Sequence, residues 1–211
     1  KGGIYIGGDN FDSSIMWEKG TPHFGRGMEY ESRPGKWLEL PLSFFHNICS
    51  WEKMNFFDSH KIRRDIQSYY HLSGQKTEVQ NLARLIGHNL GYSLFQEIEK
   101  TKKELSRAME APFGFHQADI HFDENITLEE FEQVIIRKDL DKTDAYLHDF
   151  LAKLGIAPAD IDTVFMTGGT SLVRPVRSRF TKRFGAEKIK SGDNFHSVAI
   201  GLAYSYALFS E

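Results

Sequence analysis

The most regular hydrophobic pattern of the chain runs through residues 78–110, where an apolar residue recurs every four positions and polar residues occupy the opposite side. This spacing places the apolar side chains on one face of a helix. It therefore predicts one or two long helices that pack by that face. The stripe consists of Leu82, Ile86, Leu90, Leu94 and Ile98.

A second pattern, in residues 161–184, joins a short apolar run to two glycines and a helical stripe. The run ends at Gly168-Gly169, and hydroxyls follow at Thr170 and Ser171, which predicts a strand, a glycine turn and a helix. A backbone without Cβ atoms can pass close to a ligand, and the first N–H groups of a helix attract an anion. The alternative is an ordinary strand-to-helix turn. The stripe consists of Leu172, Val176, Phe180 and Phe184.

The first residues of the chain follow the same order. Residues 4–6 predict the end of a strand, and Gly7-Gly8 predict a turn. Asp9 or Asn10 then offers a side chain that can cap the helix that follows. Because the chain starts inside such an element and without Met, we expect it to be a piece of a longer protein.

Between the two glycine turns the pattern predicts loop, helix and hairpin. Residues 20–41 are rich in Gly and Pro and predict a long irregular loop. The aromatic residues of 42–57 predict a buried helix, with a partner surface as the alternative. Alternation in 111–126 predicts a small hairpin that ends at Asp123. The aromatic residues are Phe44, Phe45, Trp51, Phe56 and Phe57.

The segments after the hairpin carry helix start and stop signals. Thr127 and Glu130 predict a capping box, in which each side chain bonds the other residue's backbone N–H. A second helix ends at Gly155, and Asp193-Asn194 can cap a terminal helix. This alternation of strand and helix predicts an α/β fold with a helical and hairpin insertion. The apolar positions of the three helices are Leu128, Phe131, Val134 and Ile135; Tyr146, Phe150 and Leu154; and Val198, Leu202, Tyr206 and Phe209.

The composition of the chain argues against several classes of function. The 211 residues, 40 % of them hydrophobic, can bury a core in one domain or two subdomains. The net charge of −3 gives no basic surplus for a phosphate backbone, so we expect no nucleic-acid partner. The single Cys49 forms no internal disulfide, which suits a cytoplasmic protein, and the scattered histidines predict no metal site. We expect no membrane span, since no apolar run approaches about 18 residues, and P-loop, Rossmann and nucleophile-elbow motifs are absent.

Four polar residues share one face of the helix predicted near residue 100. Glu99, Lys102, Lys103 and Ser106 lie at positions i, i+3, i+4 and i+7. Such a face is usually solvated charge. The same residue types could recognise a nucleoside, because a carboxylate accepts from sugar hydroxyls, a cation stem packs on a ring, and a hydroxyl bonds a ring nitrogen. Spacing alone leaves both interpretations open.

Four motifs follow one another along nearly the whole chain: Gly7-Gly-Asp-Asn-Phe-Asp12, Glu99-Lys-Thr-Lys-Lys-Glu-Leu-Ser106, Val164-Phe-Met-Thr-Gly-Gly-Thr-Ser171 and Ser197-Val-Ala-Ile-Gly201-Leu-Ala203. In this order they resemble the nucleotide-side motifs of lobe II in the seventy-kilodalton heat-shock chaperone family. The Gly-Gly-Thr-Ser sequence of the third motif and the aromatic segment after Pro41 are most similar to those of the YegD-type subgroup.

The resemblance implies an actin-like ATPase (ribonuclease H-like) fold, in which two lobes close on ATP or ADP with Mg²⁺. The chain would be lobe II, with residues 1–17 and 155–211 as the nucleotide-side subdomain and 18–154 as an inserted subdomain. Its implied partners are its own N-terminal lobe and, for a cytoplasmic stress-response chaperone, unfolded-protein clients or a co-chaperone. The implied nucleotide-binding residues are Gly8, Glu99, Lys102, Lys103, Ser106, Gly168, Gly169, Thr170 and Arg174.

In the family, the residues at Glu99 and Lys102 approach the ribose, and the residue at Ser106 approaches the adenine. Loss of Lys102 or Ser106 is therefore expected to weaken ATP binding and barely to change stability. Two positions depart from the family. Lys103 and Leu172 stand where arginines usually stack on adenine, although Arg174 could reach in from the next turn.

The catalytic and metal-organising groups of the family belong upstream of Lys1, so we expect no catalytic or metal-binding residue in this chain. Two alternatives remain. One is a lobe of an actin-like-superfamily carbohydrate kinase, against which the Glu99–Ser106 helix argues. The other is a degenerate, non-enzymatic interaction module, which the departure at Leu172 leaves open.

Overall fold

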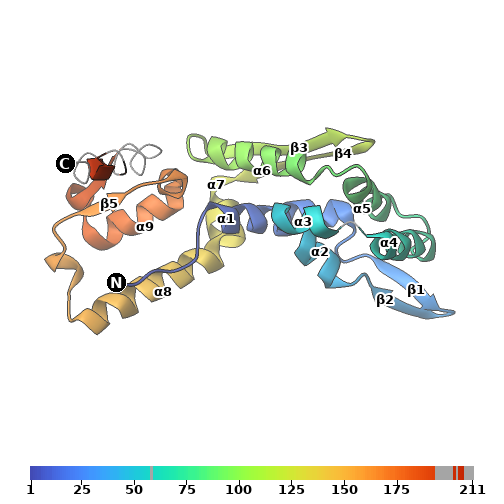
Figure 1. Cartoon of the computed structure of the whole chain (residues 1–211), viewed down its shortest axis with the longest axis horizontal. Helices are drawn as coiled ribbons and strands as arrows, with labels where there is room; N and C mark the ends of the chain where they lie inside the picture. Colours follow the sequence, from blue (N-terminus) through green and yellow to red (C-terminus); the bar gives the residue numbers. More distant parts are fainter. Residues whose placement is uncertain (58, 193–201, 203, 207–211) are drawn as a thin grey trace. The chain divides into compact units, whose positions relative to one another are not determined.

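The computed structural model describes residues 1–57, 59–192, 202 and 204–206 and shows a chain of mixed helix and strand (Figure 1). The chain divides into two compact units. Unit 1 consists of residues 1–8 and 137–211, and unit 2 consists of residues 9–136.

The subdomain bounds implied by the family resemblance group two helices differently. They place the first helix with the C-terminal segment and the helix before Gly155 with the insertion. The structure places α1 (Gly8–Ile15), apart from Gly8, in unit 2 and α8 (Arg137–Leu154) in unit 1.

Unit 2 is built from short helices and two hairpins. After α1, its helical elements are η1 (Met16–Gly20), η2 (Thr21–Phe24), α2 (Leu42–Ile48), α3 (Trp51–Phe57), α4 (His60–Leu72), α5 (Thr77–Gly87), α6 (Gly91–Leu105), α7 (Leu128–Glu130) and η3 (Phe131–Ile135). Its strands are β1 (Glu29–Arg33), β2 (Lys36–Glu39), β3 (Glu110–Gln117) and β4 (Ile120–Thr127).

The stripe of residues 78–110 forms two helices, α5 and α6, so the prediction of one or two long helices is confirmed. Leu82, Ile86, Leu94 and Ile98 are buried. The fifth stripe residue, Leu90, is the N-cap residue of α6, so the helices join at the point where the stripe passes from one to the other.

The β3–β4 hairpin holds α6 in place. The inner faces of its strands bury Phe113, Phe115 and Phe122, and β3 packs on α6. Thr101 of α6 donates a hydrogen bond from Oγ1 to the Pro112 carbonyl of β3, at 2.7 Å. The predicted hairpin is confirmed, although it continues four residues beyond Asp123, to Thr127.

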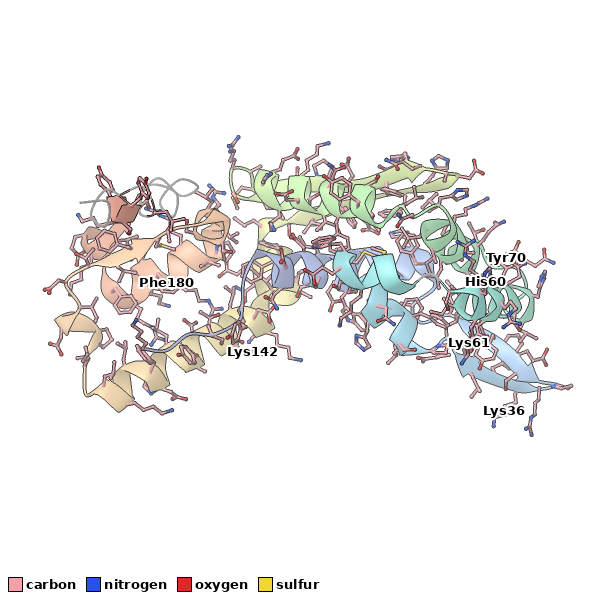
Figure 2. The ribbon with its side chains drawn as sticks, viewed as in Figure 1. Lys36, His60, Lys61, Tyr70, Lys142 and Phe180 are labelled. Carbon is pink, nitrogen blue, oxygen red and sulfur yellow. The ribbon has the colours of Figure 1, made fainter. Side chains whose placement is uncertain are left out.

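The prediction that residues 20–41 form an irregular loop is wrong. The segment contains a turn of 3-10 helix and an antiparallel hairpin, β1–β2, in which Tyr30 pairs with Leu38. Lys36, the first residue of β2, is labelled in Figure 2. Pro34-Gly35 makes the turn, and Gly35 has a φ of +75° that favours glycine. The strands escaped detection because they are short and carry charged residues.

The aromatic segment 42–57 forms two helices, α2 and α3, in place of one. Phe44 and Phe45 are buried as predicted, but Trp51 is exposed. The side chains of Phe56 and Phe57 lie outside the described residues.

The capping prediction at Thr127 is confirmed in one direction, since its hydroxyl accepts from the Glu130 N–H at 3.1 Å. The Glu130 carboxylate instead contacts Lys19 Nζ at 2.6 Å. Val134 is 60 % exposed, against the prediction that it is buried. The helix turns into a π-helix here, and this wider turn rotates Val134 outward while burying Phe131 and Ile135.

Unit 1 contains α8, which ends immediately before Gly155. Gly155 has a φ of +65°, so it ends the helix as predicted. Leu154, at the end of α8, is exposed. The remaining elements of unit 1 are η4 (Pro158–Asp160), β5 (Val164–Met166), η5 (Gly169–Leu172), α9 (Arg174–Phe184), η6 (Ala186–Lys188) and β6 (Ile189–Ser191). Strands β5 and β6 pair in parallel.

The start of the chain differs from the prediction. Residues 4–6 are not a strand, because among the described residues they have no hydrogen-bonded strand partner. Gly2 lies against Tyr146 and Phe150 of α8 instead. Helix α1 already begins at Gly8, so Asp9 and Asn10 lie in its first turn and do not precede it as a cap.

The predicted terminal helix falls mostly outside the described residues. This applies to Asp193, Asn194, Val198, Phe209 and most of the motif from Ser197 to Ala203. Of the predicted apolar stripe, Leu202 and Tyr206 are described, and both are helical and exposed.

Candidate functional site

Lys102 is the best-fixed residue of the polar face on α6. Its Nζ lies 2.7 Å from Oδ2 and 2.6 Å from Oδ1 of Asp12, which comes from α1. The side chain of Lys102 is 14 % exposed and that of Asp12 is 12 % exposed. The ammonium group is therefore held by packing and by an ion pair, unlike a solvated surface lysine.

The Asp12 carboxylate is electrostatically unusual. Burial raises the pKa of Asp12 above its ordinary value, although the neighbouring Lys102 ammonium acts in the opposite direction. The contact of Lys102 with Oδ2 has hydrogen-bond geometry, whereas no described atom donates a hydrogen bond to the buried Oδ1. Oδ1 is therefore attracted to Lys102 by charge alone, and the pair costs free energy in desolvation that the attraction must offset.

Glu99 and Lys103 are more accessible than Lys102, and Ser106 is half-buried. Lys103 Nζ contacts Glu99 Oε1 at 2.8 Å, and Lys103 is 69 % exposed. The hydrogen bond from Lys103 lowers the pKa of the Glu99 carboxyl. The Ser106 hydroxyl donates to the Lys102 carbonyl at 3.2 Å, at the end of the helix. Glu99 and Lys103 can thus reach a ligand from solvent, beside a lysine that is already positioned.

A small cavity of about 70 Å³ lies in unit 2, beside Asp12. Ligand pockets for small molecules are usually about 300 Å³ or larger. This cavity can hold water but is too small for a nucleoside. The cavity is lined by Asp9, Asp12, Ser13, Ser50, Trp51, Glu52 and Phe95.

The predicted strand, glycine turn and helix in residues 161–184 are confirmed, with a short 3-10 helix inserted before α9. Gly168 has φ +78° and ψ 166°, a conformation that is essentially restricted to glycine. Gly169 starts η5 without a positive φ, and it is exposed. The turn is closed by Ser171, whose hydroxyl donates to the Gly168 carbonyl at 2.7 Å.

The predicted helical stripe is only partly correct. Val176 and Phe184 are buried, but Leu172 is 44 % exposed because it belongs to η5 and not to α9. Arg174 is the first residue of α9 and is exposed, and Thr170 lies within η5.

The predicted site residues thus fall into two groups. Glu99, Lys102, Lys103 and Ser106 share the end of α6 in unit 2. The second group, in unit 1, is the turn formed by Gly168, Gly169, Thr170 and Arg174. Gly8 is the first residue of α1.

Sequence reasoning missed the importance of Asp12. The residue stood at the end of the first glycine motif, but its partner Lys102 is 90 positions away, and no local pattern links them. An acidic residue at position 12, within a helix that otherwise buries Phe11 and Ile15, was the available signal.

Two further observations concern only the part of the chain that the structure describes. His, Cys, Asp and Glu side chains form no group of three or more suited to a metal ion there. Nor is any helix in these residues both long and apolar enough to cross a membrane.

Comparison with known proteins identifies the relatives of the chain. A family model described as Hsp70 protein matches residues 80–211. The chain is 25 % identical over 207 residues to the chaperone protein DnaK of Thermus thermophilus, which covers 94 % of this chain and 29 % of DnaK. It is 32 % identical over 114 residues to heat shock protein hsp88 of Neurospora crassa, which covers 53 % of this chain and 16 % of hsp88.

The chain therefore spans less than a third of the length of either relative. The family match itself covers more than half of the chain and includes α6 and the glycine turn. The chain belongs to the Hsp70 family, and this membership implies the actin-like ATPase fold.

Proposed function

We propose that the chain is lobe II of a chaperone-like ATPase, closest to the YegD-type subgroup, and that it contributes the adenosine side of an ATP site. In this proposal unit 1 contains the nucleotide-side part of the lobe and unit 2 the inserted part. Family membership supports the proposal, since the curated relatives are a chaperone and a heat shock protein.

The observation that carries the proposal is the ion pair of Lys102 with the buried Asp12. A lysine on a solvated face moves freely and loses side-chain entropy when it binds a ligand. Asp12 has already restricted Lys102, so much of that cost is met on folding. An ammonium group carries three N–H donors, so a hydrogen bond to Asp12 is compatible with another to a ribose hydroxyl.

The neighbouring residues complete a nucleoside surface. The Glu99 carboxylate, whose pKa is lowered by Lys103, remains ionised near neutral pH and can accept from sugar hydroxyls. The Ser106 hydroxyl can exchange its contact with the Lys102 carbonyl for a ring nitrogen. Lys103 can pack its stem on the adenine ring, though less well than a planar arginine would.

The glycine turn suits contact with the nucleotide through its backbone. Gly169 is exposed, and a residue without a Cβ lets a ligand approach the main chain closely. As the resemblance to the family implies, we assign Gly8 to the sugar and phosphate side of the nucleotide, and Gly168, Gly169, Thr170 and Arg174 to contact with the nucleotide.

For the longer protein we propose ATP or ADP with Mg²⁺ as cofactor, slow ATP hydrolysis, and unfolded-protein clients or a co-chaperone as partners, in the cytoplasm. The catalytic and metal-binding residues would lie in lobe I. Two rivals are a carbohydrate kinase lobe, which lacks support from the relatives found, and a degenerate module without nucleotide binding.

One experiment separates these possibilities. ATP binding and phosphate release are measured side by side for the 211-residue chain and for the longer protein that contains it. We expect binding and slow release by the longer protein and only background release by the chain. Turnover by the chain at the rate of the longer protein would contradict its assignment as a non-catalytic lobe, and a longer protein that binds no ATP would support the degenerate module.

A further inference from the structure

The outer face of the β3–β4 hairpin brings two histidines together. His116 and His121 stand directly opposite each other in the strand register, and both are exposed. Their Nδ1 atoms are 3.4 Å apart. Five positions separate them in the sequence, a spacing within the range of histidine pairs in zinc sites, and in this chain the hairpin makes them neighbours.

The turn of the hairpin fixes this register. It consists of two residues, Ala118 and Asp119, with φ values of +50° and +57°. Positive φ at both positions is the mark of a type I′ turn, whose twist matches that of the strands on either side. Because the turn is this short, the pairing of His116 with His121 cannot slip without moving every side chain to the other face.

The distance between the two nitrogens suits a shared metal ion better than a hydrogen bond. Protein hydrogen bonds from N–H are usually about 2.7 to 3.2 Å long, so 3.4 Å is long for one. Two Zn–N bonds of about 2.0 to 2.1 Å at a tetrahedral angle place their nitrogens about 3.3 to 3.4 Å apart. The imidazoles are therefore spaced as ligands of one tetrahedral ion.

Asp123 orients the first of these imidazoles. Its Oδ1 lies 2.9 Å from Nε2 of His116. A carboxylate at that distance accepts a hydrogen bond from Nε2–H, which leaves the lone pair on Nδ1, the atom that faces His121. The carboxylate has room because residue 114 is glycine, and a Cβ there would lie 2.6 Å from the same Oδ1.

From this arrangement we propose that His116 and His121 bind a divalent first-row transition-metal ion of the zinc type, with Asp123 holding His116 in the required tautomer. Imidazole nitrogen is a preferred ligand of zinc, copper and nickel ions. Among the described residues no third ligand of the His, Cys, Asp or Glu type completes the set, so water fills the other positions. The site lies on the face of the hairpin opposite to the one that packs on α6, and it does not depend on nucleotide binding.

Calorimetric titration of ZnCl₂ into the untagged 211-residue chain tests the site. We expect one ion per chain in the wild type. His116→Ala and His121→Ala should each weaken binding at least tenfold, because each removes one of two protein ligands. Asp123→Asn should weaken it by roughly 10- to 100-fold, the usual effect of losing an orienting carboxylate.

His60→Ala is the matched control. His60 is the first residue of α4, is also exposed, and is labelled in Figure 2. Its removal should leave zinc affinity unchanged. All four side chains are exposed, and circular dichroism of each variant checks that the fold is retained. Equal affinity in the wild type and His121→Ala, or no zinc binding by the wild type, would overturn the site, and unchanged affinity in Asp123→Asn would overturn the role given to Asp123.

Discussion

The α6 face and the glycine turn use opposite means to present a ligand-binding surface. On α6 the side chains matter, and the most important, Lys102, is only 14 % exposed and is held by the buried Asp12. At the turn the backbone matters, and Gly168 holds a conformation that other residues rarely adopt. The two groups of proposed site residues should therefore fail differently, the α6 face when a side chain is removed and the glycine turn when a Cβ is added.

The same contrast exists within α6. Lys102 and Lys103 are adjacent in sequence, yet their side chains are 14 % and 69 % exposed. Lys102 has a buried carboxylate as partner, whereas Lys103 pairs with Glu99 one helical turn away in solvent. We expect structural consequences from the first residue and almost none from the second.

The largest predicted effect follows from removing Lys102. Lys102→Met leaves the Asp12 carboxylate buried without its cation, which typically costs about 3 to 5 kcal/mol. Because burial already raises the pKa of Asp12, the carboxyl can take up a proton and so lose its uncompensated charge. We therefore expect the free energy of unfolding to fall by about 3 kcal/mol, the lower end of that range. This replaces the expectation from sequence that loss of Lys102 barely changes stability. Urea denaturation of the 211-residue chain measures the effect.

Lys103→Met is the matched control for that measurement. An exposed ion pair at i, i+4 contributes only about 0.3 to 0.5 kcal/mol, so its loss should be small. Similar losses in the two variants would show that Lys102 and Asp12 are not the distinct pair described here.

At the turn, the predicted effect concerns Gly168 and not Gly169. Gly168→Ala should lower the free energy of unfolding by about 1 to 3 kcal/mol, the cost of a strained backbone conformation. Among the described residues, no atom other than those of its two chain neighbours lies within 4 Å of the Cβ position at Gly168, so we expect the loss to be conformational and not steric. Gly169→Ala, without a positive φ, should change stability by less than about 1 kcal/mol. Denaturation of the two variants side by side checks the difference, and an equal loss in both would contradict it.

A smaller effect should appear in the pH dependence of stability. Burial raises the pKa of Asp12 from its ordinary value of 3.8, so the folded chain binds this proton more tightly than the unfolded chain does. The resulting stabilisation is fully present below 3.8 and is lost as the pH rises through the raised pKa. Asp12→Asn cannot titrate, so the stability of the wild type relative to this variant should fall as the pH rises.

Paired urea titrations of the wild type and Asp12→Asn, at several pH values from acid to neutral, measure this change. The opposite trend, with the wild type gaining on the variant as the pH rises, would mean that attraction to Lys102 outweighs the burial of Asp12.

The sequence predicted what local patterns encode. Helices α5 and α6, the β3–β4 hairpin and the glycine turn all followed from apolar spacing or from turn residues within a few positions. The β1–β2 hairpin was missed, although Pro34-Gly35 marked its turn, because charged residues obscured the alternation of its strands.

The contacts that define the candidate site were beyond such patterns. Asp12 and Lys102 meet only because α1 and α6 pack together. Val134 faces outward because the helix widens to a π-turn, which rotates its side chains away from the positions expected for a regular α-helix. The histidine pair depends on a register that a single turn sets. Each of these features arises from tertiary packing or backbone geometry, which residue spacing does not reveal.

Ser106 offers the most direct test of the central claim that the end of α6 recognises adenosine. Its hydroxyl donates only to a helix carbonyl among the contacts observed, so Ser106→Ala should change stability little. Ser93→Ala, on the same helix but outside the polar face, is the control. ATP affinity is measured by calorimetry in the longer protein that contains the chain. We expect Ser106→Ala to weaken ATP binding by about 1 kcal/mol, roughly fivefold, and Ser93→Ala to leave the affinity unchanged. Equal affinities of the two variants and the wild type would contradict the claim and return this face to solvated charge.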